Sequence, residues 1–197
     1  MKPFSEACEE NKLPILQVLR QFLPAQGTLL EIGSGTGQHA VFFADQFPNL
    51  HWHASDIPMH LPGIRLWVNE YSGQNLHGPH ELDVNQADWP LTSVDASYSA
   101  NTTHIMHWRD VEAMFDGIGR ILNPGHYFLL YGPFCYDGQH TSQSNADFDR
   151  FLQQRDPGSG VRDVTDLKQL AHAANIDLID DISMPVNNRT LVWQKRL

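Results

Sequence analysis

The stretch Thr28-Leu-Leu-Glu-Ile-Gly-Ser-Gly-Thr-Gly-Gln38 decides the fold of this chain. It runs from a short apolar segment through an acidic residue into a glycine loop, and an apolar helical pattern follows. Gly33, Gly35 and Gly37 let the backbone turn sharply and approach a ligand closely, because no Cβ stands in the way. The pattern predicts a strand, a ligand-binding turn and a helix, with Glu31 near the strand end to take polar groups of a small molecule.

The main alternative for such a loop is the dinucleotide fingerprint G-x-G-x-x-G. After Gly33-Ser-Gly35 this fingerprint needs a glycine where the chain has Gln38. A pyrophosphate also needs a helix N-terminus directed at negative charge. S-adenosylmethionine (SAM) carries a sulfonium cation instead, which an acidic residue at the strand end suits better. The loop therefore resembles the first signature of SAM-binding, Rossmann-like methyltransferases, and favours SAM over NAD or a turn without a ligand.

The composition points to one ordinary globular domain. The 197 residues, 41% of them hydrophobic, suit a single α/β domain with a sizeable core. A net charge of −10 without a Lys/Arg cluster argues against a nucleic-acid partner. We find no signal peptide and no apolar run near the roughly 18 residues of a membrane span. Cys8 and Cys135 make no disulfide framework or metal spacing, so we expect a cytoplasmic protein without a membrane partner.

Apolar strand-like runs alternate with helical patterns, which predicts βαβ units and a largely parallel sheet. The expected fold is α/β, with a mostly parallel seven-stranded sheet, an antiparallel last strand and helices on both faces. Pro14 is expected in the first turn of the first helix. The expected strands are 28–32, 50–55, one ending near 82–84, 94–100, 126–131, 177–183 and 189–195. The expected helices are 12–23, 37–46, 60–73, 108–121, 144–154 and 164–174.

Polar residues follow four of the predicted strands, at the sheet edge where open α/β sheets bind ligands. The first strand leads to Glu31 and to a loop with Gly33, Ser34, Gly35 and Gly37. The second leads to Asp56, about twenty residues beyond the loop, whose carboxylate can accept hydrogen bonds from both ribose hydroxyls.

The third strand ends at Asp83, beside Val84, and an aspartate there can take the adenine amino group. The fourth leads to Asn101. Each polar residue also has a simpler reading, since Asp56 could begin a turn before Pro58 and Asp83 could cap the next segment. Asn101 could serve the loop alone. Because four strand ends carry such a group, together they predict a SAM site.

Three further elements are more specific than the glycine loop: Gly132-Pro-Phe134, His140-Thr-Ser142 and Arg155-Asp-Pro157. With them the chain resembles the DUF938 (UPF0585) family of class I SAM-dependent methyltransferases, also called methyltransferase-like 26 proteins, over nearly its whole length. The matching stretches are Leu30–Ala40, Ser55-Asp56, Leu82-Asp83-Val84, Trp89-Pro90, Asp95-Ala96, Tyr131-Gly-Pro-Phe134, His140–Asn145, Phe148-Asp149, Arg155-Asp-Pro157, Arg162-Asp163, Met184-Pro185 and Asn187-Asn188.

The chain departs from the family pattern at three places. Glu10-Asn11-Lys12 stands where the family carries Arg-Asn-Lys. Glu10 therefore replaces the arginine that would make an N-terminal contact in the family. Asn101-Thr-Thr-His104 replaces Asn-Met-Ile-His but keeps Asn101 and His104. The second glycine after Pro124 is His126.

The resemblance implies a Rossmann-like class I methyltransferase fold over one domain, 1–197. It implies SAM as cofactor, S-adenosylhomocysteine (SAH) as product and no metal, and it supplies no defined methyl acceptor. Within the domain we expect an N-terminal helical lid at 1–26 and an acceptor-side insertion at 132–163. The sequence makes no prediction about the oligomeric state.

Candidate acceptor residues follow the fourth and fifth strands. Methyl transfer needs alignment and exclusion of water, and a base only where the acceptor carries a proton. His104 and His140, with His107 as a further candidate, could be that base or could only order the loops. Tyr131 and Phe134 could wall the acceptor pocket or belong to the core. Arg155 and Arg162 could clamp a carboxylate or phosphate, or pair with neighbouring aspartates. Asn187 and Asn188 could form a turn that faces the same mouth.

The pairs His51/His53, His77/His80 and His104/His107 invite a metal-site hypothesis, but no Cys or Glu spacing completes a ligand set. The Asn/Asp-Pro-Pro-aromatic motif of base-modifying amino-methyltransferases is absent after the fourth strand. We therefore predict a SAM-dependent methyltransferase acting on an unidentified small molecule. The alternatives are a non-catalytic SAM-binding or interaction module and an NAD-dependent oxidoreductase, which Gln38 disfavours.

Overall fold

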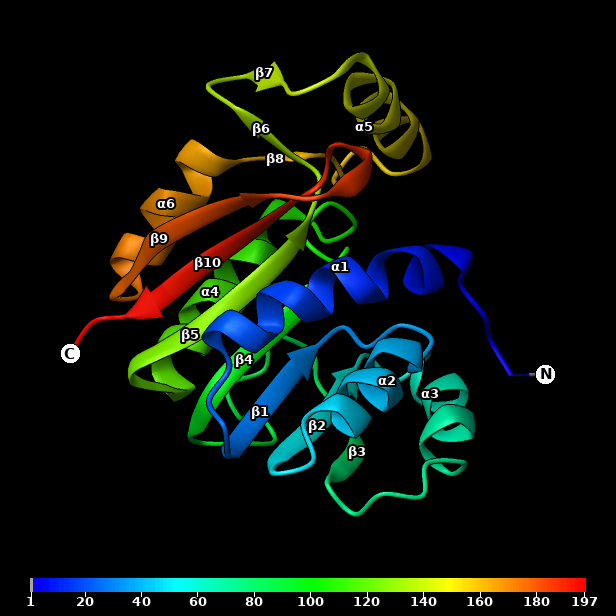
Figure 1. Ribbon diagram of the computed structural model, residues 1–197. Helices are drawn as coiled ribbons and strands as arrows, with labels where there is room; N and C mark the ends of the chain where they lie inside the picture. The colour runs from blue at the N-terminus through cyan, green and yellow to red at the C-terminus, as the bar shows by residue number, and fades with distance from the viewer. Residues whose placement is uncertain (1) are drawn as a thin grey trace.

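The main sheet decides where ligands can bind. A computed structural model describes residues 2–197 (Figure 1). Its main strands are β1 (Gly27–Ile32), β2 (Leu50–Asp56), β3 (Leu76–Glu81), β4 (Val94–Ala100), β5 (Leu122–Gly132), β9 (Ile176–Ser183) and β10 (Arg189–Lys195). They are arranged in the order β3-β2-β1-β4-β5-β10-β9. β10 pairs antiparallel with β5 and β9, and the other pairings are parallel. This confirms the predicted seven-stranded sheet.

Helices cover both faces of the sheet, as predicted. One face packs against the first three helices, where the Phe43, Trp52 and Tyr98 rings lie 5.5–5.9 Å apart. The opposite face packs against two later helices, where the Phe115 ring meets Phe128 and Trp193 edge-on. The first group is α1 (Glu6–Phe22), α2 (Gln38–Gln46) and α3 (Leu61–Val68), and the second is α4 (Trp108–Ile121) and α6 (Val164–Ala173).

The chain reverses its direction of travel across the sheet between β1 and β4. From β1 it proceeds outward through β2 to β3, and then it returns to place β4 on the other side of β1. Such a switch point leaves a crevice beyond the carboxyl ends of the two central strands, because their loops diverge to opposite sides. The glycine loop and the segment after Ala100 both open into this crevice.

A small second sheet, which the sequence pattern does not predict, stands above the main one in Figure 1. It orders β6 (Phe134–Tyr136) between β7 (Gln139–His140) and β8 (Arg162–Asp163). Helix α5 (Gln143–Arg155) joins β7 to β8 and covers the helix predicted at 144–154. These elements occupy the segment 132–163 and carry it to the carboxyl ends of the main strands.

Four predicted boundaries are wrong. Helix α1 begins before residue 12, because the Ser5 hydroxyl accepts from the Cys8 N–H at 3.4 Å, and Pro14 lies inside the helix. Helix α3 ends at Val68 instead of 73. Strand β3 ends at Glu81 and leaves residues 82–84 beyond the sheet. β5 begins at Leu122, and a short 3-10 turn (Pro185–Asn187) joins β9 to β10.

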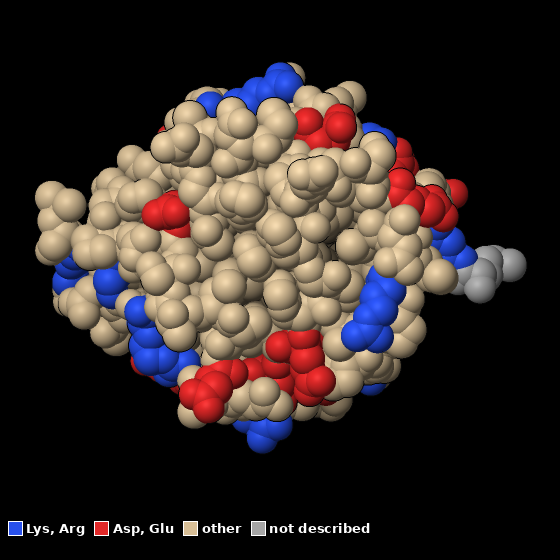
Figure 2. Space-filling model, turned by 90° about the horizontal axis from the view of Figure 1, so that it is seen from below, with Lys and Arg blue, Asp and Glu red and all other residues tan. Residues whose placement is uncertain are grey.

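Seen from below, the surface is mostly uncharged, and the Lys and Arg side chains form separate small groups (Figure 2). Within residues 2–197, no helix combines the length and the apolar character needed to cross a bilayer.

Gly117 on α4 provides a test of the packing on the sheet face that α4 and α6 cover. A Cβ on Gly117 would lie 2.0 Å from Cζ2 of Trp89, whose ring is buried. We expect Gly117→Ala to lower the free energy of unfolding by about 1–3 kcal/mol through overpacking, despite the better helix propensity of alanine. Urea unfolding would measure this loss.

Glu112→Ala is the matched control, because Glu112 is exposed on the same helix. We expect it to change the free energy of unfolding by less than about 0.5 kcal/mol. Equal stability of both variants would contradict the close packing of Trp89 on α4.

Candidate functional site

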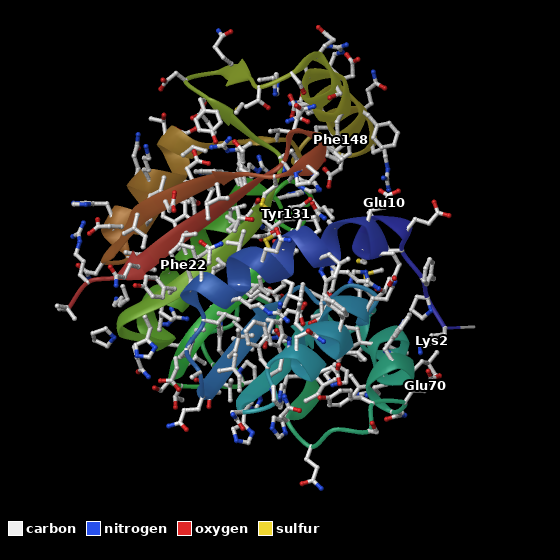
Figure 3. All side chains as sticks on the ribbon, viewed as in Figure 1. Lys2, Glu10, Phe22, Glu70, Tyr131 and Phe148 are labelled. Carbon is white, nitrogen blue, oxygen red and sulfur yellow. The ribbon has the colours of Figure 1, made fainter. Side chains whose placement is uncertain are left out.

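A pocket of about 990 Å³ lies beyond the carboxyl ends of β1, β2, β4 and β5. The first half of α1, the start of α5 and the turn between β9 and β10 close it from other sides. In Figure 3, Glu10 on α1 and Phe148 on α5 lie at this end of the molecule, and Tyr131 marks the end of β5. Of the predicted cofactor and acceptor residues, the pocket wall contains Glu31, Gly33, Ser34, Gly35, Asp56, Asp83, Val84, Asn101, His104 and Tyr131.

The glycine loop folds back onto the neighbouring strand. The N–H groups of Gly33 and Ser34 both donate to the Ser55 carbonyl, at 3.0 and 2.9 Å. Gly35 has a φ of +59°, and a Cβ there would meet no protein atom within 4 Å. The space beside Gly35 is pocket, so a ligand can approach the backbone here. Gly37 has a φ of +92° and packs against α3 at Ile64, outside the pocket wall.

Glu31 is a buried acid in the pocket wall. Burial raises its pKa to about 7, and the nearby Asp56 carboxylate acts in the same direction. Hydrogen bonds from the Trp52 indole, at 2.9 Å, and the Ser34 side chain stabilise the carboxylate only in part. A buried carboxylate with a raised pKa gains most from a cationic ligand, because the ligand charge replaces the lost hydration.

Asp56 connects the glycine loop to the pocket. One carboxylate oxygen accepts from the Gly35 N–H at 2.7 Å, and the other lies 2.8 Å from His60 Nδ1 and accepts from the Ile57 N–H. The side chain is buried at the end of β2. Two carboxylate oxygens have about four acceptor positions, so Asp56 can hold the loop and still accept from a ligand.

Asp83 and Asn101 complete the cofactor side of the pocket. Asp83 accepts from both the backbone and the side-chain amide of Asn85, at 3.0 Å each, so it caps the segment after β3 while lying in the pocket wall. These hydrogen bonds lower the pKa of Asp83. Asn101 has a φ of +58° and donates its N–H to the Tyr131 carbonyl at 2.9 Å. The left-handed backbone turns the chain sharply after β4.

Helix α1 is fastened over the pocket by residues to which the sequence analysis gave no such role. The Gln38 side chain accepts from the Ser5 N–H at 2.6 Å and donates to Glu9 at 2.9 Å. His39 Nε2 lies 2.7 Å from Asn11 Oδ1, and burial lowers the pKa of His39 to about 4. The residue that breaks the dinucleotide fingerprint therefore anchors the N-terminal helix.

His104 lies in the loop after β4 and is buried, at 5% exposure. Burial lowers its pKa to about 4, and the Arg162 charge adds to this effect. The loop is held from outside, because Arg162 donates to the carbonyls of Thr103 (2.9 Å), Met106 and Gly158 (2.9 Å). The clamp predicted for Arg162 therefore acts on this loop instead of on an acceptor.

Four other predicted acceptor residues lie outside the pocket wall. Arg155 is exposed, with its guanidinium 5.5 Å from the Phe151 ring, because it lies on the outer side of α5. Phe134 is fully buried in the core against α4 and α6. His140 lies on β7 with Nε2 3.5 Å from Asp149. Asn187 is exposed, and its neighbours Val186 and Asn188 face the pocket instead.

Asn188 faces the pocket, as predicted for its turn, whereas Asn145 and Phe148 on α5 and Val186 in the turn are pocket residues to which the sequence analysis gave no site role. Asn145 donates to the Asn187 carbonyl at 3.0 Å, and Asn188 donates to the Tyr131 hydroxyl at 3.0 Å. Phe148 lies in the wall one helical turn after Asn145. The helical spacing of Asn145 and Phe148 was the available signal, since residues three apart share a helix face.

Four of the histidines contact each other across the neighbouring strands β2 and β3, and not within the pairs that lie close together in the sequence. His51 Nδ1 lies 3.0 Å from His77 Nε2, and His53 Nδ1 lies 3.0 Å from His80 Nε2. His107 Nε2 lies 2.8 Å from Asp156. Over residues 2–197, no three His, Cys, Asp or Glu side chains are placed to hold a metal ion.

The strand order and the glycine loop define the Rossmann-like fold of class I methyltransferases. The chain belongs to the family described as "Protein of unknown function (DUF938)", whose model matches residues 2–195. Similar solved structures include an O-methyltransferase family protein from Burkholderia thailandensis, with 15% identity and a TM-score of 0.80 over 94% of this chain and 56% of that one.

Two other similar structures are described with a ligand. Human N-acetylserotonin methyltransferase in complex with SAM has 16% identity and a TM-score of 0.74, over 92% of this chain and 51% of that one. A methyltransferase of calicheamicin biosynthesis in its SAH-bound form has 16% identity and a TM-score of 0.75, over 96% and 54%. The chain thus spans about half the length of the solved structures it matches, and at these identities the likeness shows the fold.

The raised pKa of Glu31 predicts how stability depends on pH. Between pH 4.5 and about 7 the folded protein retains the Glu31 proton while the unfolded chain has lost it. Ionisation therefore removes stability as the pH rises through this window, by up to about 3 kcal/mol. As the pH rises from 4.5 to 7, the free energy of unfolding of Glu31→Gln should therefore increase relative to that of the parent protein.

Three histidines with lowered pKa values change the stability in the opposite direction. The measured quantity is therefore the difference in stability between Glu31→Gln and the parent protein. The pKa values of His39, His53 and His104 are lowered to about 4 by burial, so these residues remove stability as the pH falls below 6.5. Chemical denaturation of both proteins between pH 4.5 and 8 cancels this shared contribution. Parallel stability profiles would show that Glu31 ionises normally.

Proposed function

We propose that this protein is a SAM-dependent methyltransferase whose acceptor is a small molecule. The observation that carries the proposal is the buried carboxylate of Glu31 in the pocket wall beside an open glycine loop. A sulfonium or ammonium cation stabilises such a carboxylate, whereas a pyrophosphate would oppose it. Gln38 does not serve a dinucleotide either, because its side chain is engaged with Ser5 and Glu9.

The proposed cofactor contacts follow the pocket from β1 to β4. Glu31, Gly33, Ser34 and Gly35 hold the methionine end, and Asp56 receives the ribose hydroxyls. Asp83 and Val84 receive the adenine, and Asn101 lies between cofactor and acceptor. SAM supplies a methyl group on a sulfonium, which makes the carbon electrophilic without a metal. The protein aligns the acceptor and excludes water with α1 and α5.

Comparisons support this proposal. Two similar proteins are described with SAM or SAH bound, and another belongs to an O-methyltransferase family. Because this chain spans about half their length, we place the acceptor site within this chain's own segments: the loop after β4, residues 132–163 and the turn between β9 and β10. Assignment to the methyltransferase-like 26 group and a cytoplasmic location stay predictions.

Calorimetric titration with SAM, SAH and NAD tests the proposal. We expect micromolar binding of SAM and SAH and no heat with NAD. Silence for both adenosyl ligands with folded protein would overturn the cofactor, and binding without turnover of any acceptor would favour a non-catalytic SAM-binding module.

A charge-removing variant tests the place of the ribose. Asp56→Asn keeps an acceptor for the Gly35 N–H but removes the carboxylate charge. We expect SAM affinity to fall about tenfold, since hydrogen bonds to charged groups contribute more than neutral ones. Asp116→Asn, on the exposed face of α4 and outside the pocket wall, is the control. An equal effect of both variants would contradict the placement of the ribose.

SAM affinity should also depend on pH through Glu31. With a pKa of about 7, Glu31 is mostly protonated at pH 6 and mostly ionised at pH 8. If a cation binds only the ionised form, affinity is about tenfold lower at pH 6 and binding releases a proton. Titrations in buffers of different ionisation enthalpy measure that proton. Glu31→Gln should abolish this part of the dependence, and an unchanged profile in the variant would assign it elsewhere.

A further inference from the structure

The part of the pocket away from the glycine loop has an apolar wall. Ile105 and Met106 come from the loop after β4, Phe148 from α5, and Pro185 and Val186 from the turn between β9 and β10. Ile105 and Val186 are 62% and 79% exposed, although both are large and apolar. Exposed apolar side chains gathered at the mouth of a pocket fit a ligand with an apolar body.

Val186 is held in a conformation that valine disfavours. Its φ and ψ are 59° and 36°, which is the left-handed region, and a β-branched residue is rare there. The turn is fixed by the Met184 N–H to Asn188 carbonyl bond at 2.9 Å and by the Asn145 bond to the Asn187 carbonyl. Strain imposed by surrounding contacts at a pocket mouth points to a ligand contact of the Val186 side chain.

The charges around the pocket are unfavourable for an anion. Carboxylates predominate in the wall, and among residues 2–197 Arg109 is the one Arg or Lys that lines it; its side chain is 79% exposed and paired with Asp110. Arg162, which is partly buried beside the loop after β4, is occupied by three backbone carbonyls. The carboxylates in the wall are Glu10, Glu31, Asp56, Asp83 and Asp110. A carboxylate or phosphate on the acceptor would therefore meet like charge without a partner.

His104 is a buried polar residue beside the apolar wall whose side chain has no hydrogen-bond partner among residues 2–197. Its Nδ1 is covered by protein atoms and makes no hydrogen bond, and no residue from 2 to 197 bonds to Nε2. The Phe148 ring meets the imidazole edge-on, with 5.3 Å between ring centroids. Because Nδ1 is covered, Nε2 is the nitrogen that a ligand can reach. The imidazole is uncharged at neutral pH, so it adds no repulsion to a sulfonium.

On this basis, and resting on the proposed function, we propose that the acceptor is an uncharged hydroxyl compound with a flat apolar body. Its body lies against Phe148, Ile105 and Val186, and its hydroxyl donates to His104 Nε2. In the transfer, the acceptor oxygen forms the new bond to the methyl carbon while the carbon–sulfur bond breaks. That electron pair goes to the sulfur, which leaves neutral SAH, and the hydroxyl proton passes to His104 and then to solvent.

Three matched probes test this class on the SAH-loaded protein: 2-naphthol, 6-hydroxy-2-naphthoate and naphthalene. We expect 2-naphthol to bind about five- to tenfold more tightly than naphthalene, which lacks the hydroxyl. The carboxylate should bind at least about tenfold more weakly than 2-naphthol, because it meets like charge. Calorimetry gives the affinities, and SAH release from SAM with 2-naphthol reports transfer.

Two variants separate ligand contact from a structural role. His104→Phe should reduce 2-naphthol affinity to that of naphthalene and leave naphthalene affinity unchanged, whereas a merely structural histidine would affect both probes equally. Val186→Gly should weaken both probes about threefold or more while leaving SAH binding unchanged. His51→Phe, at the amino end of β2 far from the pocket, is the control.

Failure of the two proposals can be distinguished. Protein that does not bind SAH contradicts the proposed function itself. Protein that binds SAH but prefers the carboxylate, or binds none of the three probes, overturns the acceptor class alone.

Discussion

The pair of hydrogen bonds from Gly33 and Ser34 to the Ser55 carbonyl is the interaction on which the rest of the site depends. It bends the chain after β1 onto the end of β2, where Asp56 then accepts from Gly35. The bend brings the glycine loop, Glu31 and Asp56 into one wall of the pocket. Without this bend the Gly35 N–H would not meet Asp56, and the glycine loop would not line the crevice at the switch point.

The pocket is closed mainly by polar contacts. Gln38 bonds to the backbone and side chains of α1, and His39 meets Asn11 across the same gap. On the other side Asn188 reaches Tyr131. Contacts of this kind exchange readily with water, so they hold the start of α1 and the turn between β9 and β10 less firmly than core packing holds the second half of α1. Segments held this way can open to admit or release a ligand.

The sheet and the part of the pocket wall that extends from β1 to β4 were predictable because their signals are local. Strand periodicity gives the order of elements, and Glu31, Asp56, Asp83 and Asn101 each follow a strand that the pattern identifies. The acceptor side was not, because its contacts join distant residues. Nothing near Arg162 in the sequence indicates that it binds the carbonyls of Thr103 and Met106. The turn at Val186 and the start of α5 likewise meet only in three dimensions.

The pocket wall draws on residues from Ser5 to Asn188, which includes both the first helix and the hairpin of the last two strands. No part of the sequence can therefore build the cavity alone. A bound ligand would raise the free energy of every opening that detaches α1 or β10, and not only that of one loop. Binding at this site would then couple the two ends of the chain into a single cooperative unit.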